Sequence, residues 1–285
     1  MGGNVSAVIG EMQTAELNEL FSRSFPRQED MLRQLLNDVQ QLYRGEWEQW
    51  QPCQVVYHNI GHIHAVLTVA LQILVGHSKL HHQVAQTSRV KVLAAAALFH
   101  DSGYLKEKSD SSAGSGGQYT FEHVERSQLL AQSYLAQRSD WSVQECQAVD
   151  VLIGATKIIA VSEQPLTLAP EFDGLANMLA SADLLAQMAD EYYLDKLPQL
   201  YAEFAEAYAV KGRRQLNQLG FLIFDSYAQL LGSSAGFIRQ QVLPRLQQLG
   251  DQEQALQAYF ATQPSPYMHQ LMLNLHHIDS LPKQS

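Results

Sequence analysis

The chain has 285 residues, of which 46% are hydrophobic, enough for one large domain or two small ones with a buried core. Its 19 basic and 29 acidic residues give a formal net charge of −10, which argues against binding to nucleic acid polymers or to anionic membranes. Because Cys53 and Cys146 are far apart and residues 1–16 have no signal-peptide pattern, we expect a soluble, cytoplasmic protein without a disulfide framework.

Apolar residues recur at helical intervals through most of the chain. The expected helices cover 26–43, 59–75, 88–99, 143–158, 175–189, 192–210, 215–231, 235–249 and 252–261. Gly76 is expected to close the second of them, and Ser142 with Glu145 forms a capping-box pattern before the fourth. Pro198 and Pro244 are expected to kink or split their helices. No alternation of apolar and polar residues is long enough for a sheet, so the predicted fold class is all-α.

Residues 106–118 (KEKSDSSAGSGGQ) differ from the rest of the chain. This segment is rich in serine and glycine, which is typical of a mobile surface loop that cannot contribute to a core. It follows His100 and Asp101 closely, so it can cover a site there. The alternative is an insertion that the fold tolerates.

Three short segments carry residues that can hold a metal. His58 and His62 are four apart and would share one face of a helix. His100 and Asp101 follow an apolar run and can reach one ion if the helix ends there, while Asp183 lies inside an apolar helix and needs a partner if it is buried. Each segment also has a plain structural explanation: a chance histidine pair, a polar helix end and an exposed aspartate.

Taken in order, these segments resemble the HD superfamily of metal-dependent phosphohydrolases, and its phosphodiesterase-like branch in particular. The matching residues are Tyr57-His58-Asn59, His62, Val66, His100-Asp101, Gly103-Tyr104 and Asp183. Two intermediate segments also fit, since Glu122-His123 with Ser127 resembles an EHxxxS helix and residues 153–156 resemble an IxAT segment. The resemblance covers about residues 57–190.

The resemblance implies an HD-domain helical bundle with its core at about 57–190. Helices at 11–45 and 191–280 would support this core within a single domain over 1–285. The resemblance also implies His62, His100, Asp101 and Asp183 as metal ligands and His58 as the proton donor. This mixed nitrogen and oxygen set suits a divalent ion such as Mn, Fe, Ni, Zn or Mg. The expected substrate is a phosphorylated small molecule, with Asp101 orienting or sharing the attacking water.

The roles of three residues, and the function itself, have alternatives. Thr156 stands where some members carry another histidine, which argues against a second tightly held metal. His123 is a candidate for substrate or second-ion binding, or else a helix-surface histidine. Lys157 is a candidate phosphate contact, or else a solvated lysine. A di-iron oxygenase on the HD fold and a metal-binding regulatory protein without turnover are the alternatives to a phosphohydrolase.

Overall fold

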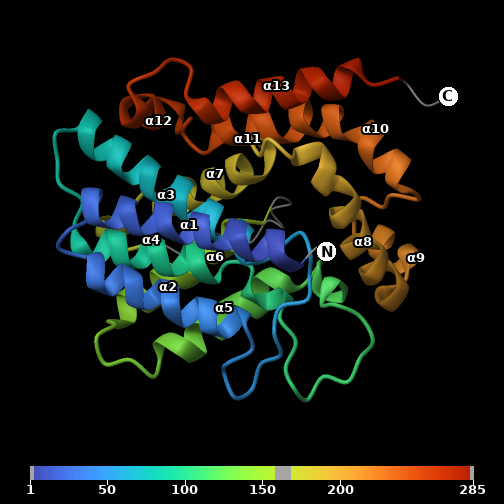
Figure 1. Ribbon diagram of the computed structural model, residues 1–285, viewed down its shortest axis with the longest axis horizontal. Helices are drawn as coiled ribbons and strands as arrows, with labels where there is room; N and C mark the ends of the chain where they lie inside the picture. The colour runs from blue at the N-terminus through green and yellow to red at the C-terminus, as the bar shows by residue number, and fades with distance from the viewer. Residues whose placement is uncertain (1–2, 158–167, 283–285) are drawn as a thin grey trace.

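All regular secondary structure in the part of the chain described by the computed structural model, residues 3–157 and 168–282, is helical. This confirms the predicted all-α class. The α-helices (Figure 1) are α1 (Gly3–Ser24), α2 (Glu29–Tyr43), α3 (Ile60–Leu80), α4 (Thr87–Phe99), α5 (His123–Leu135), α6 (Val143–Gly154), α7 (Leu175–Met188), α8 (Tyr193–Lys211), α9 (Arg213–Gln218), α10 (Tyr227–Phe237), α11 (Leu243–Gln248), α12 (Glu253–Phe260) and α13 (Pro266–Ser280). Short turns of other helix types are η1 (Ser102–Tyr104), η2 (Gly117–Tyr119), η3 (Pro170–Phe172) and η4 (Ile238–Val242).

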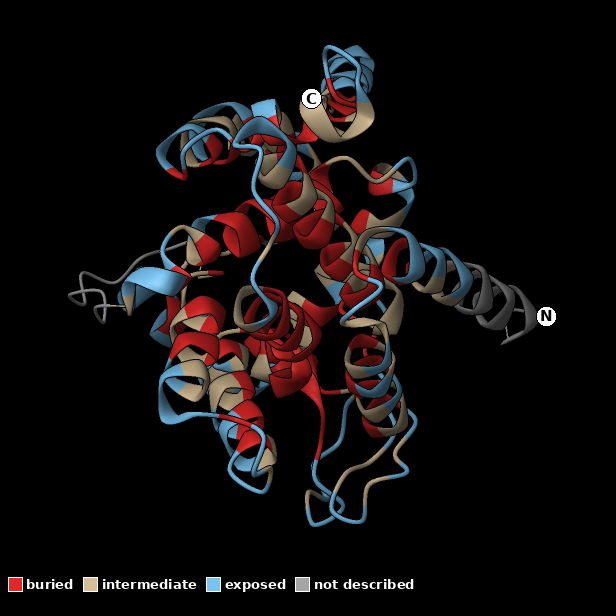
Figure 2. Ribbon diagram, turned by 90° about the vertical axis from the view of Figure 1, so that its left-hand side faces the viewer, coloured by how far each residue is buried: buried red, intermediate tan, exposed pale blue. Residues whose placement is uncertain are grey.

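Helix α3 lies at the centre of the core. It packs against α1, α4, α7 and α12. Figure 2 shows that the buried residues gather in the middle of the molecule. Next to α3, α4 contacts α2 and α6 as well, and its run of alanines at 94–97 is completely buried. Small side chains let neighbouring helices approach closely, which explains why this alanine-rich stretch can be enclosed on several sides.

Among the described residues, α3 is the helix that is long and apolar enough to cross a membrane by length and composition. A core helix of a soluble protein has the same length and composition when it is buried on most sides. In this structure 56% of its apolar window is buried, and four other helices pack on it. These contacts account for its apolar character.

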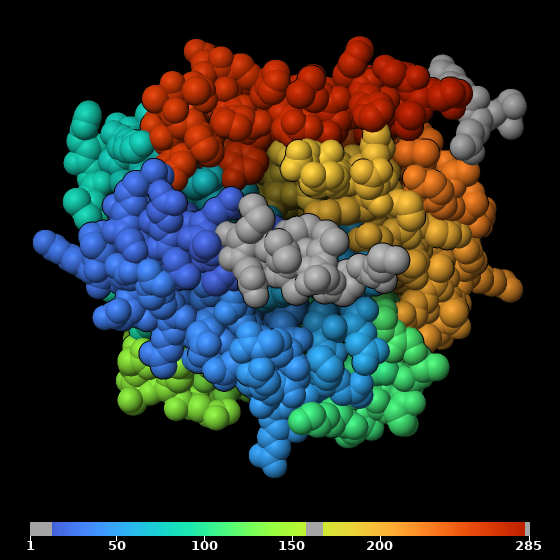
Figure 3. Space-filling view, in the orientation of Figure 1, coloured from blue at the N-terminus to red at the C-terminus, as the bar shows by residue number. Residues whose placement is uncertain are grey.

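The C-terminal helices close one side of the core. In Figure 3 they form a continuous band along one edge of the molecule, with α12 over α3 and α13 over α7. Gly76 lies in the interior of α3, so the prediction that it closes this helix is wrong. The position requires a glycine because the α12 backbone approaches it closely. A Cβ atom at position 76 would lie 1.9 Å from the carbonyl oxygen of Ala255.

Replacing Gly76 with alanine should therefore destabilise the protein. Alanine normally favours a helix over glycine by about 1 kcal/mol, but overpacking of this kind costs about 1–3 kcal/mol and should outweigh it. The denaturant midpoint of unfolding should fall for Gly76→Ala. Gly232→Ala in α10 is the matched control, because a Cβ there meets nothing within 4 Å. An unchanged or higher midpoint for Gly76→Ala would contradict the close contact between α3 and α12.

The predicted helix over 215–231 is wrong, since the segment contains two helix ends. α9 ends before Gly220, which has a positive φ of 88°. The amides of Gly220 and Phe221 donate to the carbonyls of Asn217 and Leu216, as in a Schellman motif. The following helix, α10, begins after Ser226, whose side chain caps it.

Other predicted boundaries shift by smaller amounts. The capping box of Ser142 and Glu145 is present at the start of α6, as predicted. Helix α8 continues through Pro198 and is not split there. The predicted helix over 235–249 is instead the end of α10, the π-helical turn η4 and α11, with Pro244 in the first turn of α11. A proline there follows the π turn, where regular helical hydrogen bonding is already interrupted.

Candidate metal centre

Two of the predicted ligand segments are placed by helix ends. His62 is in the first turn of α3, which starts after Asn59, and the Asn59 side chain accepts a hydrogen bond from Gly61 N at 2.8 Å. At the other segment α4 ends at Phe99, so His100 and Asp101 leave the regular helix. Because the helix stops there, these adjacent side chains can reach the same point, as the sequence predicted.

The four residues proposed as ligands come together at one place. His62 Nε2 lies 3.3 Å from His100 Nε2, 3.3 Å from Asp101 Oδ2 and 3.2 Å from Asp183 Oδ1. His100 Nε2 lies 3.2 Å from Asp101 Oδ2 and 3.7 Å from Asp183 Oδ1. The ligand atoms of His62, His100 and Asp183 all lie within 4.8 Å of one another, so this group could hold a metal ion. Asp101 joins it through its contacts with both imidazoles.

The chemistry of these donor atoms fits a cation. Donors about 2.1 Å from an ion are about 3.0 Å apart in an octahedron and about 3.4 Å apart in a tetrahedron, close to the spacings here. The Nδ1 atom of His100 is 2.8 Å from Ala97 O and must donate, so Nε2 is the nitrogen that faces the carboxylates and would bind an ion once its proton is released. Gln187 donates to Asp183 Oδ1 at 2.9 Å and holds that carboxylate in place. A bound cation would take the place of the imidazole proton as the positive charge beside the two carboxylates.

The charges in this cluster support one another despite burial. Burial favours the neutral form of Asp101, but His100, His58 and His62 outweigh it and hold the pKa of Asp101 well below its usual value. The pKa of Asp183 is also lowered, since His100 and His62 together overcome the effect of burial. Burial acts against the charged form of His100, but Asp101 and Asp183 raise its pKa well above the usual value. Both carboxylates are therefore ionised at neutral pH and can bind a cation.

His58 faces this cluster, although not for the reason predicted. It precedes α3, so the expected shared helix face with His62 is wrong. The two rings nevertheless meet edge to face, with centroids 5.7 Å apart. Tyr104 stacks on the His58 imidazole, at 4.5 Å between centroids and 9° between planes.

Glu203 on α8 is the partner of His58 that the sequence did not reveal. Its Oε2 lies 2.6 Å from His58 Nδ1, and its Oε1 accepts hydrogen bonds from the amides of Tyr57 at 2.8 Å and His58 at 3.3 Å. The side chain is only 3% exposed. A carboxylate can only accept, so Nδ1 of His58 carries a proton and Nε2 is left for other partners. The residue stands on the apolar stripe of α8, an unusual place for a glutamate and the one signal that the sequence offered.

His123 lies at the edge of the same cluster and is not a free surface histidine. Its Nε2 is 3.5 Å from Asp101 Oδ1, the oxygen that does not face His62 and His100. Its Nδ1 donates to Thr120 O at 2.7 Å, and Tyr104 stacks on its ring at 4.6 Å. Burial lowers the pKa of His123 although Asp101 acts in the opposite direction. A neutral imidazole therefore presents a lone pair toward Asp101.

The structure does not bring Lys157 to the ligands. Its ammonium group pairs with Glu125 at 2.6 Å, and both groups are partly exposed. Thr156, at the position of the additional histidine in some HD proteins, donates its hydroxyl hydrogen to Ile153 O at 2.8 Å. Neither residue contacts a ligand of the cluster through these bonds.

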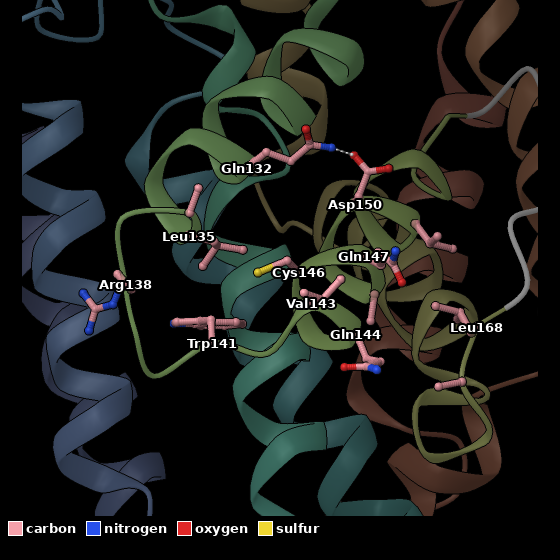
Figure 4. A pocket seen from close by; sticks show the side chains of 14 residues that line it. Gln132, Leu135, Arg138, Trp141, Val143, Gln144, Cys146, Gln147, Asp150 and Leu168 are labelled. Atoms are coloured by element: carbon pink, nitrogen blue, oxygen red, sulfur yellow. Dashed lines mark hydrogen bonds between the residues drawn. The ribbon is translucent and has the colours of Figure 1, made fainter.

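A separate cavity of about 800 Å³ lies along α5 and α6 and reaches residues 168–169. Figure 4 shows Leu135, Trp141 and Cys146 on its wall and a hydrogen bond of 2.7 Å from Gln132 to Asp150. Its lining includes none of the four proposed ligands, nor His58 or His123. This cavity is therefore separate from the proposed metal centre.

Comparison with known proteins places the chain among relatives without naming a reaction. The sequence model of a family described as Npun_R2479-like matches residues 4–249. The matched range includes every residue of the cluster and also Glu203. No curated protein matches the chain.

Proposed function

The chain belongs to the Npun_R2479-like family, and we propose that it is a metal-dependent phosphohydrolase of the HD type. One observation carries the proposal: two imidazoles and two carboxylates from three separate segments place nitrogen and oxygen atoms that can bind a metal around a single point. Burying two carboxylates is costly unless positive charge compensates them. The order of these residues along the chain, with a histidine first, a His-Asp pair next and an aspartate last, also supports the HD assignment.

The ligands would be His62, His100, Asp101 and Asp183. A mixed set of nitrogen and oxygen donors without thiolate suits Mn, Fe, Ni, Zn or Mg. When bound, a divalent ion supplies Lewis-acid polarisation of a phosphoryl oxygen and a water of lowered pKa. The substrate proposed is a small phosphorylated molecule, because the net charge of −10 argues against a nucleic acid polymer.

His58 would act as the proton donor to the leaving oxygen. Its imidazole faces the cluster and is held between the Tyr104 ring and the Glu203 carboxylate. With Nδ1 bound to Glu203, only Nε2 is available to exchange a proton with the substrate. Burial lowers the pKa of His58, but Glu203 and Asp101 outweigh it and raise the pKa, which favours a protonated donor near neutral pH.

Metal removal and reconstitution test this function. The protein should be stripped with a chelator, reloaded separately with Mn, Fe, Ni, Zn or Mg, and assayed with a panel of phosphomonoesters and phosphodiesters. We expect one ion per chain and a hydrolytic activity that disappears with the chelator and returns with at least one metal. Two irons per chain with oxygen consumption would favour an oxygenase instead. Metal binding without turnover of any ester would favour a regulatory role.

A further inference from the structure

The Ser- and Gly-rich segment 106–118 is tied to α8 by one carboxylate. Glu206 Oε2 accepts hydrogen bonds from Ser115 N at 2.9 Å and Ser115 Oγ at 2.8 Å. Its Oε1 accepts from Gly116 N and Gln118 N, each at 3.0 Å. Four donors from one short stretch thus surround a single side chain. Successive backbone amides arranged in this way form a nest that binds an anion.

The glycines of this segment permit close contact rather than free movement. Gly114 and Gly116 have positive φ values of 113° and 115°, which favour glycine strongly. A Cβ atom on Gly116 would lie 2.2 Å from Tyr104 O, and one on Gly117 would lie 2.9 Å from the Cα of Glu203. The segment is therefore pressed against the two residues that hold His58, and the prediction that it cannot pack is wrong at its C-terminal end.

From this stretch a chain of contacts leads to the metal cluster. Thr120 Oγ1 donates to Gly117 O at 2.6 Å, and Thr120 O accepts from His123 Nδ1 at 2.7 Å. The other nitrogen of His123 faces Asp101. Tyr104, against which Gly116 packs, stacks on both His123 and His58. Residues 115–118 thus contact both residues whose rings lie beside the cluster, Tyr104 directly and His123 through Thr120.

We propose that Glu206 is a positioning residue that fixes the 115–118 segment on α8 and through it orients His123 and Tyr104 at the metal centre. The structural part of this inference is independent of the reaction, and its effect on turnover rests on the proposed function. Glu203 and Glu206 are three residues apart, so one helix face holds both His58 and the glycine-rich segment. Burial raises the pKa of Glu206, but the bonds from Ser115, Gln118 and Gly116 outweigh it and lower the pKa, as expected for a bound carboxylate.

The test compares Glu206→Gln with Asp195→Asn, which removes a carboxylate from an exposed position of the same helix. In Glu206→Gln one acceptor oxygen becomes an amide donor that faces the loop amides. We expect hydrogen exchange at residues 115, 116 and 118 to become about 10- to 100-fold faster, since bonds to a charged acceptor are the stronger kind. Trypsin should also cleave more readily after Lys106 or Lys108. Asp195→Asn should behave as the wild type in both measurements.

Two further readouts separate positioning from a general loss of structure. The ¹⁵N signals of the His123 ring should move from the Nδ1–H form toward a mixture in Glu206→Gln, while metal content stays at the wild-type level. If the protein hydrolyses phosphoesters, kcat should fall about 10-fold or more, in line with the cost of misplacing groups around a reacting centre. Ser115→Ala, which removes one of the four donors, should give smaller changes in the same direction and serves if Glu206→Gln folds poorly.

The outcomes distinguish this inference from the proposed function. Unchanged exchange at residues 115–118, or faster exchange with an unchanged His123 signal, would overturn the positioning role whatever the activity. A wild-type protein without phosphohydrolase activity would remove the proposed function, yet a loosened segment and a shifted His123 signal would still support the role of Glu206. Loosening with full activity in a hydrolytically active protein would show that turnover does not depend on this segment, and would overturn that part of the inference.

Discussion

Replacing Asp101 with alanine is expected to remove both the metal and the hydrolytic activity. Asp101 Oδ2 contacts both imidazoles of the cluster, and its other oxygen faces His123. Loss of an outer partner of a metal site typically costs about 10- to 100-fold in metal affinity or activity, and loss of a charged ligand should cost more. Metal content after dialysis and the rate of phosphoester hydrolysis should therefore both fall by more than about 100-fold.

Asp150→Ala is a suitable control for this experiment. Asp150 is a partly buried carboxylate on α6 with a glutamine partner, and it lies on the wall of the separate cavity (Figure 4). Its removal should leave metal content and rate close to those of the wild type. Circular dichroism of Asp101→Ala should still show a helical protein. Wild-type metal content and rate in Asp101→Ala would rule out its role as a ligand.

Replacing His58 with alanine should give the second large effect, a loss of turnover with the metal retained. General acid catalysis contributes about 10²- to 10⁴-fold, and a loss of this size is expected for alkyl phosphoesters. Nitrophenyl esters have a leaving group that departs without protonation, so their hydrolysis should fall much less. The measurement is kcat for both ester types in the same metal-loaded variant.

Glu203→Gln should reproduce this dependence on the leaving group in weaker form. Glutamine keeps an oxygen that can accept from the amides of Tyr57 and His58. An uncharged NH₂ group then stands opposite His58 Nδ1 in place of the carboxylate oxygen. The imidazolium of His58 is then less stable, and the rate of the variant should fall more for alkyl esters than for nitrophenyl esters.

Equal losses on both ester types in His58→Ala, with metal retained, would remove His58 from the acid role.

The local parts of this molecule could be predicted from the sequence. Helical spacing gave the all-α class, and the Ser142–Glu145 capping box is formed by neighbours along the chain. The proposed ligands stand in three short segments whose order along the chain matches the HD pattern. Their grouping could therefore be predicted without knowing how the helices pack. The end of α4 at His100 could likewise be foreseen, because adjacent ligands need an interrupted helix.

Glu203 and Glu206 could not be found in this way because their partners are distant in the chain. Glu203 contacts His58 across 145 positions, and Glu206 contacts Ser115 across 91. On an amphipathic helix a glutamate is expected to face water, and only the tertiary structure shows these two facing donors. The prediction of a mobile loop is wrong at the C-terminal end of segment 106–118 for a related reason. Composition does not distinguish glycines that allow movement from glycines that allow close packing.

The most direct test of the central claim is anomalous diffraction from crystals of the protein loaded with Zn²⁺, recorded at the zinc edge. One strong peak per chain is expected, about 2.0–2.2 Å from the Nε2 atoms of His62 and His100 and from carboxylate oxygens of Asp101 and Asp183. A peak elsewhere, with no density between these four side chains at saturating zinc, would contradict it.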